Sequence, residues 1–285
     1  EIEAALDMLQ AYKASVPAVP ITDSFPSLLD QCEAMCQSFT GPEPIRTLHH
    51  FACSGGTLIA KCIAALPSVV LLNEIDPLSQ IHLPQNRRAP KFAPTDLFGA
   101  LQISRREVNP TVVVDGFREA TQTIVGGLAS RGQSLVIRLA HSHFCTQIDP
   151  NSRPTLHEIL ATGRHPVVSL LTVRHPLDSF LSLNANGWLH FSPSTLETYS
   201  QRYAEFLDRH ADLDLVRYED FVAAPERTLE KICQIIALPY HASALELFTI
   251  IRLSGDSGRK GAQIAERPRR ERFAGIFGDW LAGRK

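Results

Sequence analysis

A short turn between an apolar segment and a helical pattern carries residues suited to bind an anion. The stretch CSGGT occupies residues 53–57, and its two glycines let backbone amides converge where a helix dipole also favours negative charge. Thr57 adds a hydroxyl group. The lysine of a nucleoside-triphosphate loop is absent, so the pattern G-x-x-x-x-G-K-S/T is not met. The turn therefore predicts an anion site that does not hold ATP; a glycine turn that only reverses the chain is the alternative.

A second candidate phosphate contact follows another apolar segment, in LLTVRHPLDSFLSLNANGW at residues 170–188. The apolar run ends at Arg174, and a helix that starts at a proline carries Ser182 two turns later. A guanidinium group forms charge-assisted hydrogen bonds with phosphate oxygens. The arginine and the serine can therefore face one bound phosphate.

Two histidines follow a third apolar segment, in SLVIRLAHSHFC at residues 134–145. His141 and His143 have the i, i+2 spacing that places both side chains on one side of an extended segment. Either imidazole is suited to take a proton from a substrate hydroxyl, and a structural or capping histidine is the alternative for each. Glu74, which follows the apolar run VVLLN, is a weaker candidate for the base; a helix cap or a substrate contact suits it equally well.

Short apolar segments that alternate with helical patterns must position these residues. Strands are predicted at 47–53, 68–73, 134–139, 167–174 and 212–218, and helices at 57–66, 94–104, 117–130 and 225–236. This alternation indicates a parallel sheet covered on both faces, with ligands beyond the C-terminal ends of its strands. We predict a single α/β domain at residues 41–285, with a central parallel sheet flanked by helices. Residues 1–40 are predicted to be an N-terminal helical segment packed on this core.

The composition is that of an ordinary globular protein, and the formal net charge of −2 argues against a nucleic-acid partner. A basic stretch at residues 252–272 is the exception, as a solvated surface or an anion clamp. No apolar run approaches the ~20 residues of a membrane helix, and no signal peptide is visible. The chain starts at Glu1, which leaves an excised leader or upstream domain open. Six dispersed cysteines lack the spacing of a zinc site, so we expect reduced thiols and a cytoplasmic location.

Four motifs in order resemble the sulfotransferase family that uses 3′-phosphoadenosine-5′-phosphosulfate (PAPS). The loop at 53–57 is similar to the family's S-G-T-T loop, and residues 174–182 match its R-x-P-x-D-x-x-x-S segment. The segment DLVRYEDFVAAPERTLEKICQIIALP is similar to the lead-in R-Y-E-D-L-x-x-x-P. Residues 259–261 are similar to the C-terminal R-K-G, so that the resemblance extends over about residues 45–270.

The resemblance implies a P-loop-like fold and transfer of a sulfonate group from PAPS to an acceptor hydroxyl, by in-line displacement with a histidine base and without a metal ion. The family places this histidine near His141 or His143, and His141 fits more closely although it is one residue out of register. The implied cofactor contacts are Ser54, Gly55, Gly56, Thr57 and Leu58 for the phosphosulfate, Arg174, Ser182, Arg259, Lys260 and Gly261 for the 3′-phosphate, and Tyr218 near the adenine.

One position departs from the family pattern. Many relatives carry Lys or Arg where Cys53 stands, and that cation offsets the charge on the bridging oxygen as the sulfonate leaves. His50, Arg138 or an arginine of the C-terminal stretch are the candidates to replace it. Lys61 is a weaker candidate, because we predict that it points along the surface of its helix.

Two other functions compete with sulfonate transfer. A P-loop kinase would need the missing lysine and a strand-terminal aspartate for Mg²⁺. An inactive nucleotide-binding relative that acts as a binding module would account for Cys53. The acceptor is expected to be a small molecule, a lipid or a biosynthetic intermediate, with its pocket shaped by residues 75–109 and the N-terminal segment; the oligomeric state stays open.

Overall fold

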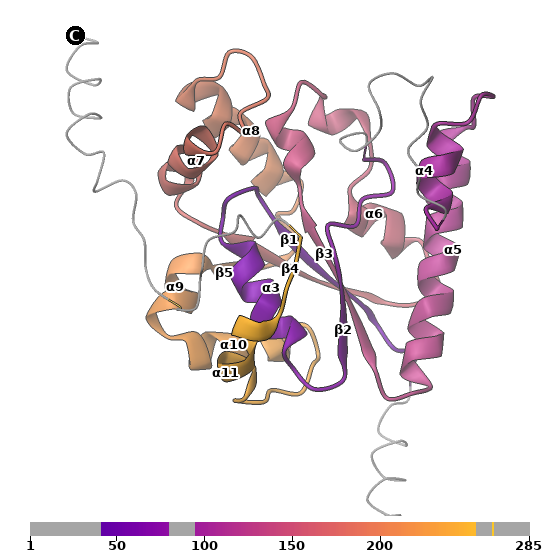
Figure 1. The fold of residues 1–285 in the computed structure, drawn as a ribbon, viewed down its shortest axis with the longest axis vertical. Helices are drawn as coiled ribbons and strands as arrows, with labels where there is room; N and C mark the ends of the chain where they lie inside the picture. Colours follow the sequence, from indigo (N-terminus) through magenta and orange to yellow (C-terminus); the bar gives the residue numbers. More distant parts are fainter. Residues whose placement is uncertain (1–40, 80–94, 255–263, 265–285) are drawn as a thin grey trace, which may run out of the picture. The chain divides into compact units, whose positions relative to one another are not determined.

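The centre of the protein is a five-stranded parallel sheet with the strand order β2-β3-β1-β4-β5 (Figure 1). The computed structural model describes residues 41–79, 95–254 and 264. The strands are β1 (Ile45–His50), β2 (Val69–Asn73), β3 (Ser134–Ala140), β4 (Val167–Val173) and β5 (Asp214–Arg217). The predicted α/β fold with a central parallel sheet is therefore confirmed. The predicted helical segment at 1–40 and the predicted clamp Arg259, Lys260 and Gly261 lie outside the described residues.

The strands all run in one direction, so their C-terminal ends meet at one edge of the sheet, where ligands of parallel sheets bind. The turn at 51–55 follows β1, and Glu74 follows β2. His141 directly follows β3, Arg174 follows β4 and Tyr218 follows β5. Residues predicted from five separate segments thus come to the same edge.

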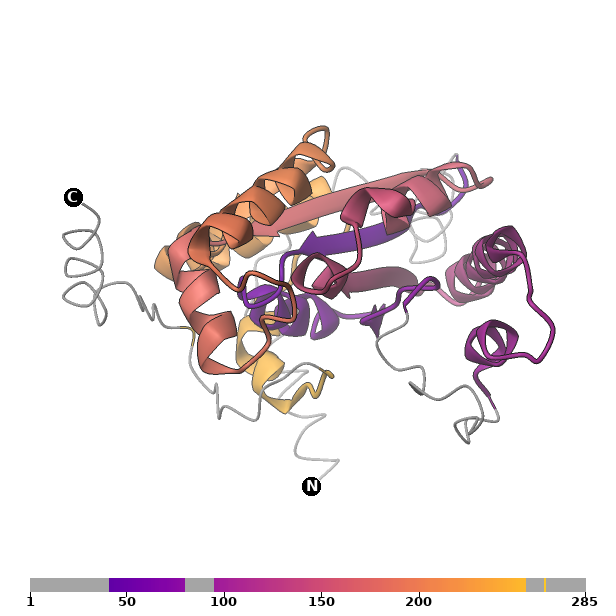
Figure 2. The same ribbon diagram turned by 90° about the horizontal axis from the view of Figure 1, so that it is seen from above.

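Helices cover both faces of the sheet (Figure 2). Side chains of a strand alternate between the faces, and the packing follows this rule. On one face, Leu48 and Val136 pack with α3, α10 and α11. On the other face, Ile45 and Ile137 pack with α5 and α6, and Leu171 packs with α7 and α8. The helices are α3 (Gly56–Ala64), α4 (Leu97–Gln102), α5 (Pro110–Ala129), α6 (Leu156–Ala161), α7 (Pro176–Ala185), α8 (Leu196–Asp208), α9 (Tyr218–Ala223), α10 (Pro225–Ile235) and α11 (Ala244–Leu247).

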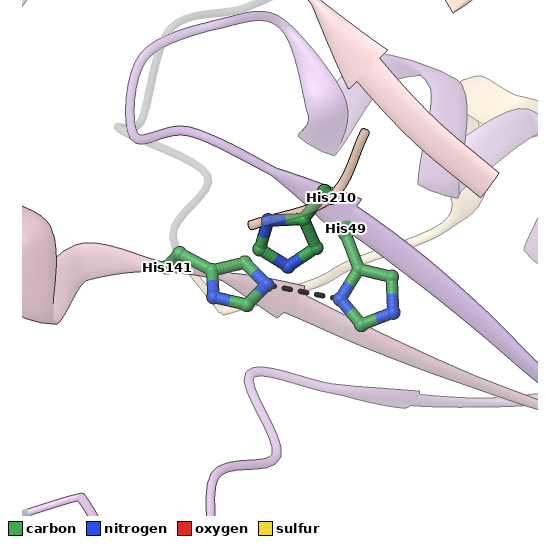
Figure 3. Close-up of side chains that lie close together, drawn as sticks. All are labelled: His49, His141 and His210. Carbon is green, nitrogen blue, oxygen red and sulfur yellow. Dashed lines mark hydrogen bonds between the residues drawn. The ribbon is translucent and has the colours of Figure 1, made fainter. Parts of the chain in front are cut away.

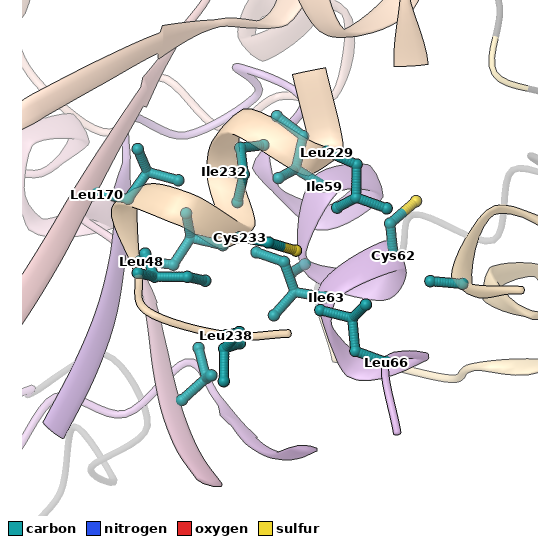
Figure 4. Packing of buried hydrophobic residues seen from close by; sticks show 14 of the residues in the cluster. Leu48, Ile59, Cys62, Ile63, Leu66, Leu170, Leu229, Ile232, Cys233 and Leu238 are labelled. Atoms are coloured by element: carbon teal, nitrogen blue, oxygen red, sulfur yellow. The ribbon is translucent and has the colours of Figure 1, made fainter. Parts of the chain in front are cut away.

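Helix α3, which begins at the glycine turn, is held by a dense apolar core (Figure 4). Ile59 and Ile63 on α3 pack against Leu48 of β1 and against Leu229 and Ile232 of α10, and each of the five is at most 1% exposed. Burial of such a side chain contributes about 1.5–3 kcal/mol. The start of α3, and with it the turn, is therefore fixed relative to the sheet.

Helix α5 begins earlier than the sequence predicted. The predicted start was Phe117, but the helix starts at Pro110. The side chain of Asn109 accepts a hydrogen bond from the amide of Thr111, and proline occupies the first turn. Both are helix-start signals that outweigh the poor helical propensity of the valines after them.

Two predictions from composition concern the cysteine thiols and the lack of a membrane-spanning helix. Cys53, Cys62, Cys145 and Cys233 are free thiols in the described part of the chain. Burial raises the pKa of Cys62 and of Cys145 to about 12, so these two thiols are unreactive. Within residues 41–79 and 95–254, no helix has both the length and the apolar character needed to span a membrane.

Candidate active site

The turn between β1 and α3 is a tight loop that presents backbone amides. Cys53 and Gly55 have positive φ angles of 60° and 86°. The hydroxyl and the amide of Ser54 both donate to the carbonyl of Phe51, at 2.7 and 3.3 Å. Helix α3 then starts at Gly56, and no described side chain caps its first amides. The amide of Leu58 donates to the carbonyl of Gly55 at 3.0 Å. The amides of Gly56 and Thr57 precede the first acceptor inside the helix, so these two are available to an anion.

Both glycines of the loop are required by aromatic rings that lie against them. A β-carbon on Gly55 would lie 2.2 Å from Cδ2 of Tyr218, and one on Gly56 would lie 2.3 Å from the ring of His50. Real β-carbons do not approach other atoms closer than 3.0 Å. Tyr218, at the end of β5, and His50, at the end of β1, are therefore in direct contact with the loop.

Arg138 of β3 brings a cation to the loop. Its side chain is buried, and it donates from Nη2 to Oγ1 of Thr57 and from Nε to Nε2 of His50, both at 2.8 Å. Nη1 forms an ion pair with Glu74 at 2.7 Å and donates to Asn73. Burial lowers the pKa of Arg138, and the Glu74 carboxylate opposes that shift. Two candidates to replace the cation absent at Cys53 contact the loop, His50 and Arg138. Burial, followed by Arg138, holds the pKa of His50 well below 6.5, so Arg138 is the one of the two that carries a charge near pH 7.

Lys61 and Glu74, two other residues considered in the sequence, have environments that differ from those predicted. Lys61 is 7% exposed, so the prediction that it points along the helix surface is wrong. The reason is that α3 is covered both by the sheet and by α10 and α11. Glu74 uses one carboxylate oxygen for Arg138 and the other to accept the amide of Ala140 at 3.1 Å. This arrangement favours a role in positioning Arg138 over a role as the base.

Arg174 reaches the loop through Tyr218. The guanidinium carbon of Arg174 lies 4.8 Å from the centroid of the Tyr218 ring, which is a cation–π contact. The Tyr203 hydroxyl fixes the backbone there, since it accepts from the amide of Arg174 at 3.3 Å and donates to its carbonyl at 2.9 Å. The Tyr218 ring thus touches Gly55 and Arg174 together, and it joins the two segments that were predicted to bind phosphate.

Ser182 lies on α7, which is bonded to the same loop. The hydroxyl of Ser179 donates to the carbonyl of Ala52 at 2.9 Å, and the amide group of Asn186 lies 3.9 Å from Sγ of Cys53. Ser182 is three residues after Ser179 and four before Asn186, so it shares the helix face that meets the loop. It is 3% exposed.

The segment after β3 does not continue as an extended chain. A 3-10 helix, Ser142–Cys145, begins directly after His141, so the prediction of an extended segment is wrong. Strand β1 ends at His50, whose carbonyl accepts the amide of His141 at 3.0 Å. Beyond this bond, none of the described strands pairs with β3 to keep it extended. The rings of His141 and His143 nevertheless lie close, with centroids 5.5 Å apart.

His141 is fully buried and its ring is held by a second histidine. Nε2 of His141 lies 2.9 Å from Nδ1 of His49, and Nε2 of His49 lies 2.8 Å from Oγ1 of Thr47. Nδ1 of His141 has no hydrogen-bond partner among the described residues. Burial, followed by the nearby His49, holds the pKa of His141 well below 6.5, so the ring is neutral near pH 7. In the tautomer that donates Nε2–H to His49, Nδ1 carries a lone pair that can accept a proton.

His143 lies in a less favourable environment for a base. Its Nδ1 accepts a hydrogen bond from Nη2 of Arg153 at 3.2 Å, and Arg153 forms an ion pair with Asp76 at 2.5 Å. Burial, together with Arg153 and Arg209, lowers the pKa of His143 to about 3. Cations thus oppose proton uptake at His143, and the geometry favours His141.

Reasoning from the sequence did not select His49 or Tyr203. His49 lies inside a predicted strand, and its importance depends on β3 pairing beside it. The alternation of faces along β1 is the one signal that could have separated His49 from His50. Tyr203 is placed by the packing of α8, which a local pattern does not reveal.

The chain is similar to known proteins of one family. A model described as "Sulfotransferase family" matches residues 51–242. Comparison with curated proteins gives no match.

Several solved structures show similarity to this chain. A sulfotransferase domain from the curacin biosynthetic pathway is 17% identical, with a TM-score of 0.48, and the match covers 82% of this chain and 87% of that one. A sulfotransferase domain from the olefin synthase of Synechococcus PCC 7002 is 18% identical, with a TM-score of 0.45 and coverages of 80% and 88%. A mouse sulfotransferase complexed with PAP is 12% identical, with a TM-score of 0.40 and coverages of 86% and 87%.

Proposed function

The chain belongs to the sulfotransferase family, whose model matches more than half of its length, and we propose that it transfers a sulfonate group from PAPS to an acceptor hydroxyl. The observation that carries this proposal is the contact of the Tyr218 ring with both Gly55 and Arg174. It joins a loop suited to a phosphosulfate to an arginine suited to a second phosphate. A nucleotide with phosphate groups at both ends requires two such sites.

The loop residues Ser54, Gly55, Gly56, Thr57 and Leu58 hold the phosphosulfate in this proposal. The amides of Gly56 and Thr57 supply most of the hydrogen bonds, because the hydroxyl and the amide of Ser54 both donate to Phe51 and the amide of Leu58 donates to Gly55. The hydroxyl oxygen of Thr57 accepts a hydrogen bond from Arg138. The hydroxyl proton of Thr57 is therefore directed away from β3 and towards a ligand. Arg138 replaces the cation that relatives carry at the position of Cys53. Its ion pair with Glu74 reduces its net charge effect, so the amides and Thr57 must contribute to charge stabilisation on the leaving side.

The 3′-phosphate is held by Arg174 and Ser182, with Arg259, Lys260 and Gly261 as further proposed contacts. Arg174 is preorganised for this role, because Tyr218 stacks on its guanidinium and Tyr203 fixes its backbone. Tyr218 is also the proposed contact of the adenine.

His141 is the proposed base. The acceptor oxygen forms a bond to sulfur, the bond from sulfur to the bridging oxygen breaks, and 3′-phosphoadenosine-5′-phosphate (PAP) leaves. The hydroxyl proton passes to Nδ1 of His141, and His49 stabilises the resulting imidazolium by accepting its Nε2–H. The step needs no metal ion. The acceptor is a small molecule, a lipid or a biosynthetic intermediate, and a cytoplasmic setting is part of the proposal.

Isothermal titration calorimetry with PAP tests the proposal, in parallel with a sulfonate-transfer assay. We expect wild-type protein to bind PAP more tightly than adenosine 5′-monophosphate. Arg174→Ala should weaken PAP binding by roughly 1.5–3 kcal/mol, the range for a charge-assisted hydrogen bond, and should reduce the discrimination between the two nucleotides. The matched control is Arg131→Ala, since Arg131 is an exposed arginine that precedes β3 at the opposite end of the sheet.

The competing functions give different results in these assays. Unchanged PAP affinity in Arg174→Ala would refute the assignment of the 3′-phosphate site. PAP binding without transfer to any acceptor would support a binding module. Loss of turnover in a chelator, restored by Mg²⁺, would instead support a kinase, because chelation should not reduce sulfonate transfer.

A further inference from the structure

Three histidines converge in the interior, on the face of the sheet that α5, α6, α7 and α8 cover (Figure 3). His49 is on β1, His141 directly follows β3, and His210 is in the turn between α8 and β5. Their exposed fractions are 0%, 0% and 2%. One ring nitrogen from each lies within 4.8 Å of the other two. Segments far apart in the sequence thus bring three potential metal ligands to one point.

His210 provides a buried lone pair that has no partner. Its Nδ1 lies 2.7 Å from the carbonyl of Phe206, and since a carbonyl can only accept, Nδ1 carries the proton. Nε2 of the neutral ring is therefore an acceptor, and it makes no hydrogen bond within the described part of the chain. Figure 3 shows this nitrogen directed at the space between His141 and His49. Leaving such a group buried and unsatisfied is costly unless a ligand binds it.

His49 is also held in a tautomer that suits a ligand. Its Nε2 lies 2.8 Å from Oγ1 of Thr47, which in turn lies 2.6 Å from Oγ of Ser169. When Nε2–H donates to Thr47, the lone pair of Nδ1 points at His141. Outer hydrogen bonds of this kind orient metal-binding histidines in proteins. Phe144 and Phe206 pack around His141, so the cluster lies in an apolar surrounding.

We propose that Nδ1 of His49, Nε2 of His141 and Nε2 of His210 bind one divalent transition-metal ion of the Zn²⁺ type. Tetrahedral coordination with bonds of about 2.0–2.1 Å requires ligand nitrogens roughly 3.3 Å apart. The ligand nitrogens of His49 and His141 are 2.9 Å apart, and all three ligand nitrogens lie within 4.8 Å of one another. These distances bracket ~3.3 Å, so small rotations of the rings are sufficient to reach tetrahedral geometry. Three neutral imidazoles favour Zn²⁺, Co²⁺, Ni²⁺ or Cu²⁺ over Mg²⁺ and Ca²⁺, which prefer oxygen ligands.

The metal ion does not take part in the transfer step; its binding regulates the activity. This regulation rests on the proposed function, in which His141 is the base. A metal ion on Nε2 leaves the single proton of the neutral His141 ring on Nδ1. That nitrogen can then no longer accept the proton of the acceptor hydroxyl. Metal binding should therefore inhibit sulfonate transfer.

Co²⁺ titration of the full chain, after treatment with a chelator and desalting, tests the metal site without any activity assay. We expect one equivalent of Co²⁺ to give the intense visible absorption of a tetrahedral nitrogen site, and Zn²⁺ to bleach it. Zn²⁺ should also raise the melting temperature, as any ligand specific to the folded state does. Wild-type protein that shows no such absorption and no stoichiometric uptake of Zn²⁺ would overturn the proposal.

Ring-conserving variants assign the ligands. His210→Phe and His49→Phe should each weaken Co²⁺ binding by more than the ~10–100-fold that loss of an outer partner costs. His157→Phe is the matched control, since His157 contacts His49 edge-on and bonds to Ser169 but offers no ligand to the cluster. His190→Ala removes an exposed histidine and controls for surface binding. Binding that is unchanged in a folded His210→Phe or His49→Phe protein would overturn the proposal.

The activity assay separates this inference from the proposed function. Stoichiometric Zn²⁺ should reduce transfer in wild-type protein, and a chelator should restore it. Metal uptake that leaves transfer unchanged would keep the metal site but refute His141 as the base. An absence of uptake with normal transfer would refute the metal site alone.

Discussion

Replacement of Gly55 by alanine tests whether the loop after β1 and Tyr218 form one unit. The φ angle at Gly55 is +86°, and an added β-carbon would lie 2.2, 2.5 and 2.9 Å from three atoms of the Tyr218 ring. That ring is only 8% exposed, so it cannot turn into solvent to relieve the contact. Either the ring or the loop must shift, and both movements separate Arg174 from the loop.

The expected loss of stability has two parts. An alanine in the left-handed region costs about 1–2 kcal/mol. Forcing an extra carbon into a packed site adds about 1–3 kcal/mol. Gly55→Ala should therefore lower the free energy of unfolding by about 2–5 kcal/mol. For a domain of this size each kcal/mol corresponds to about 2–4 °C, so the melting temperature should fall by about 10 °C.

Gly132→Ala provides a matched control. Gly132 has a φ angle of +67°, and a β-carbon there would meet no atom within 4 Å. Only the backbone cost of about 1–2 kcal/mol should appear, and PAP affinity should not change. The difference between the two variants in thermal unfolding, followed by circular dichroism, isolates the contact with Tyr218. Calorimetry with PAP should show weaker binding for Gly55→Ala alone.

A double variant checks the cause of the effect. If the clash with Tyr218 destabilises Gly55→Ala, it should disappear in a protein that already carries Tyr218→Ala. In that background, Gly55→Ala should lower the free energy of unfolding by no more than Gly132→Ala lowers it in wild-type protein. Equal melting temperatures for Gly55→Ala and Gly132→Ala, together with wild-type PAP affinity in both, would refute the described contact between the loop and Tyr218.

Two further predictions concern the buried histidines. His141→Ala should lower turnover by about 10²–10⁴-fold with little change in PAP affinity, and His143→Ala should lower it less; near-normal turnover of both would exclude them and favour Glu74. Because burial holds the pKa values of these rings below 6.5, the unfolded chain takes up protons that the folded chain does not, so stability is lost as the pH falls below about 6.5. Between pH 7 and pH 5.5, His143 and His210, with pKa values of about 3 and about 4, should each contribute a loss of about 1.2 kcal/mol. Urea unfolding at pH 7 and 5.5 measures this loss, and a midpoint that rises on acidification would contradict it.

Local sequence patterns predicted the strands well, because each is a short apolar run bounded by turns. The same patterns predicted that the loop, Arg174 and Tyr218 come to one edge, since parallel strands end together. They did not predict which cation serves the loop. Arg138 was one of several candidates, and its selection depends on partners from β1, β2 and α3, namely His50, Asn73, Glu74 and Thr57. Lys61 was assigned to the surface for the same reason: a local helical pattern does not reveal that a second layer covers α3.

The alternation of side chains along β1 explains how one strand serves two kinds of chemistry. His50 points to the face of α3, where it contacts Gly56 and accepts a hydrogen bond from Arg138. His49 points to the opposite face, where it holds His141 and faces His210. The sheet backbone separates the loop, which we propose binds the phosphosulfate, from the histidine cluster, although both lie at the end of the same strand. Changes at His49 should therefore act on the proposed base and the proposed metal site while PAP binding persists, whereas changes at His50 should act first on the loop.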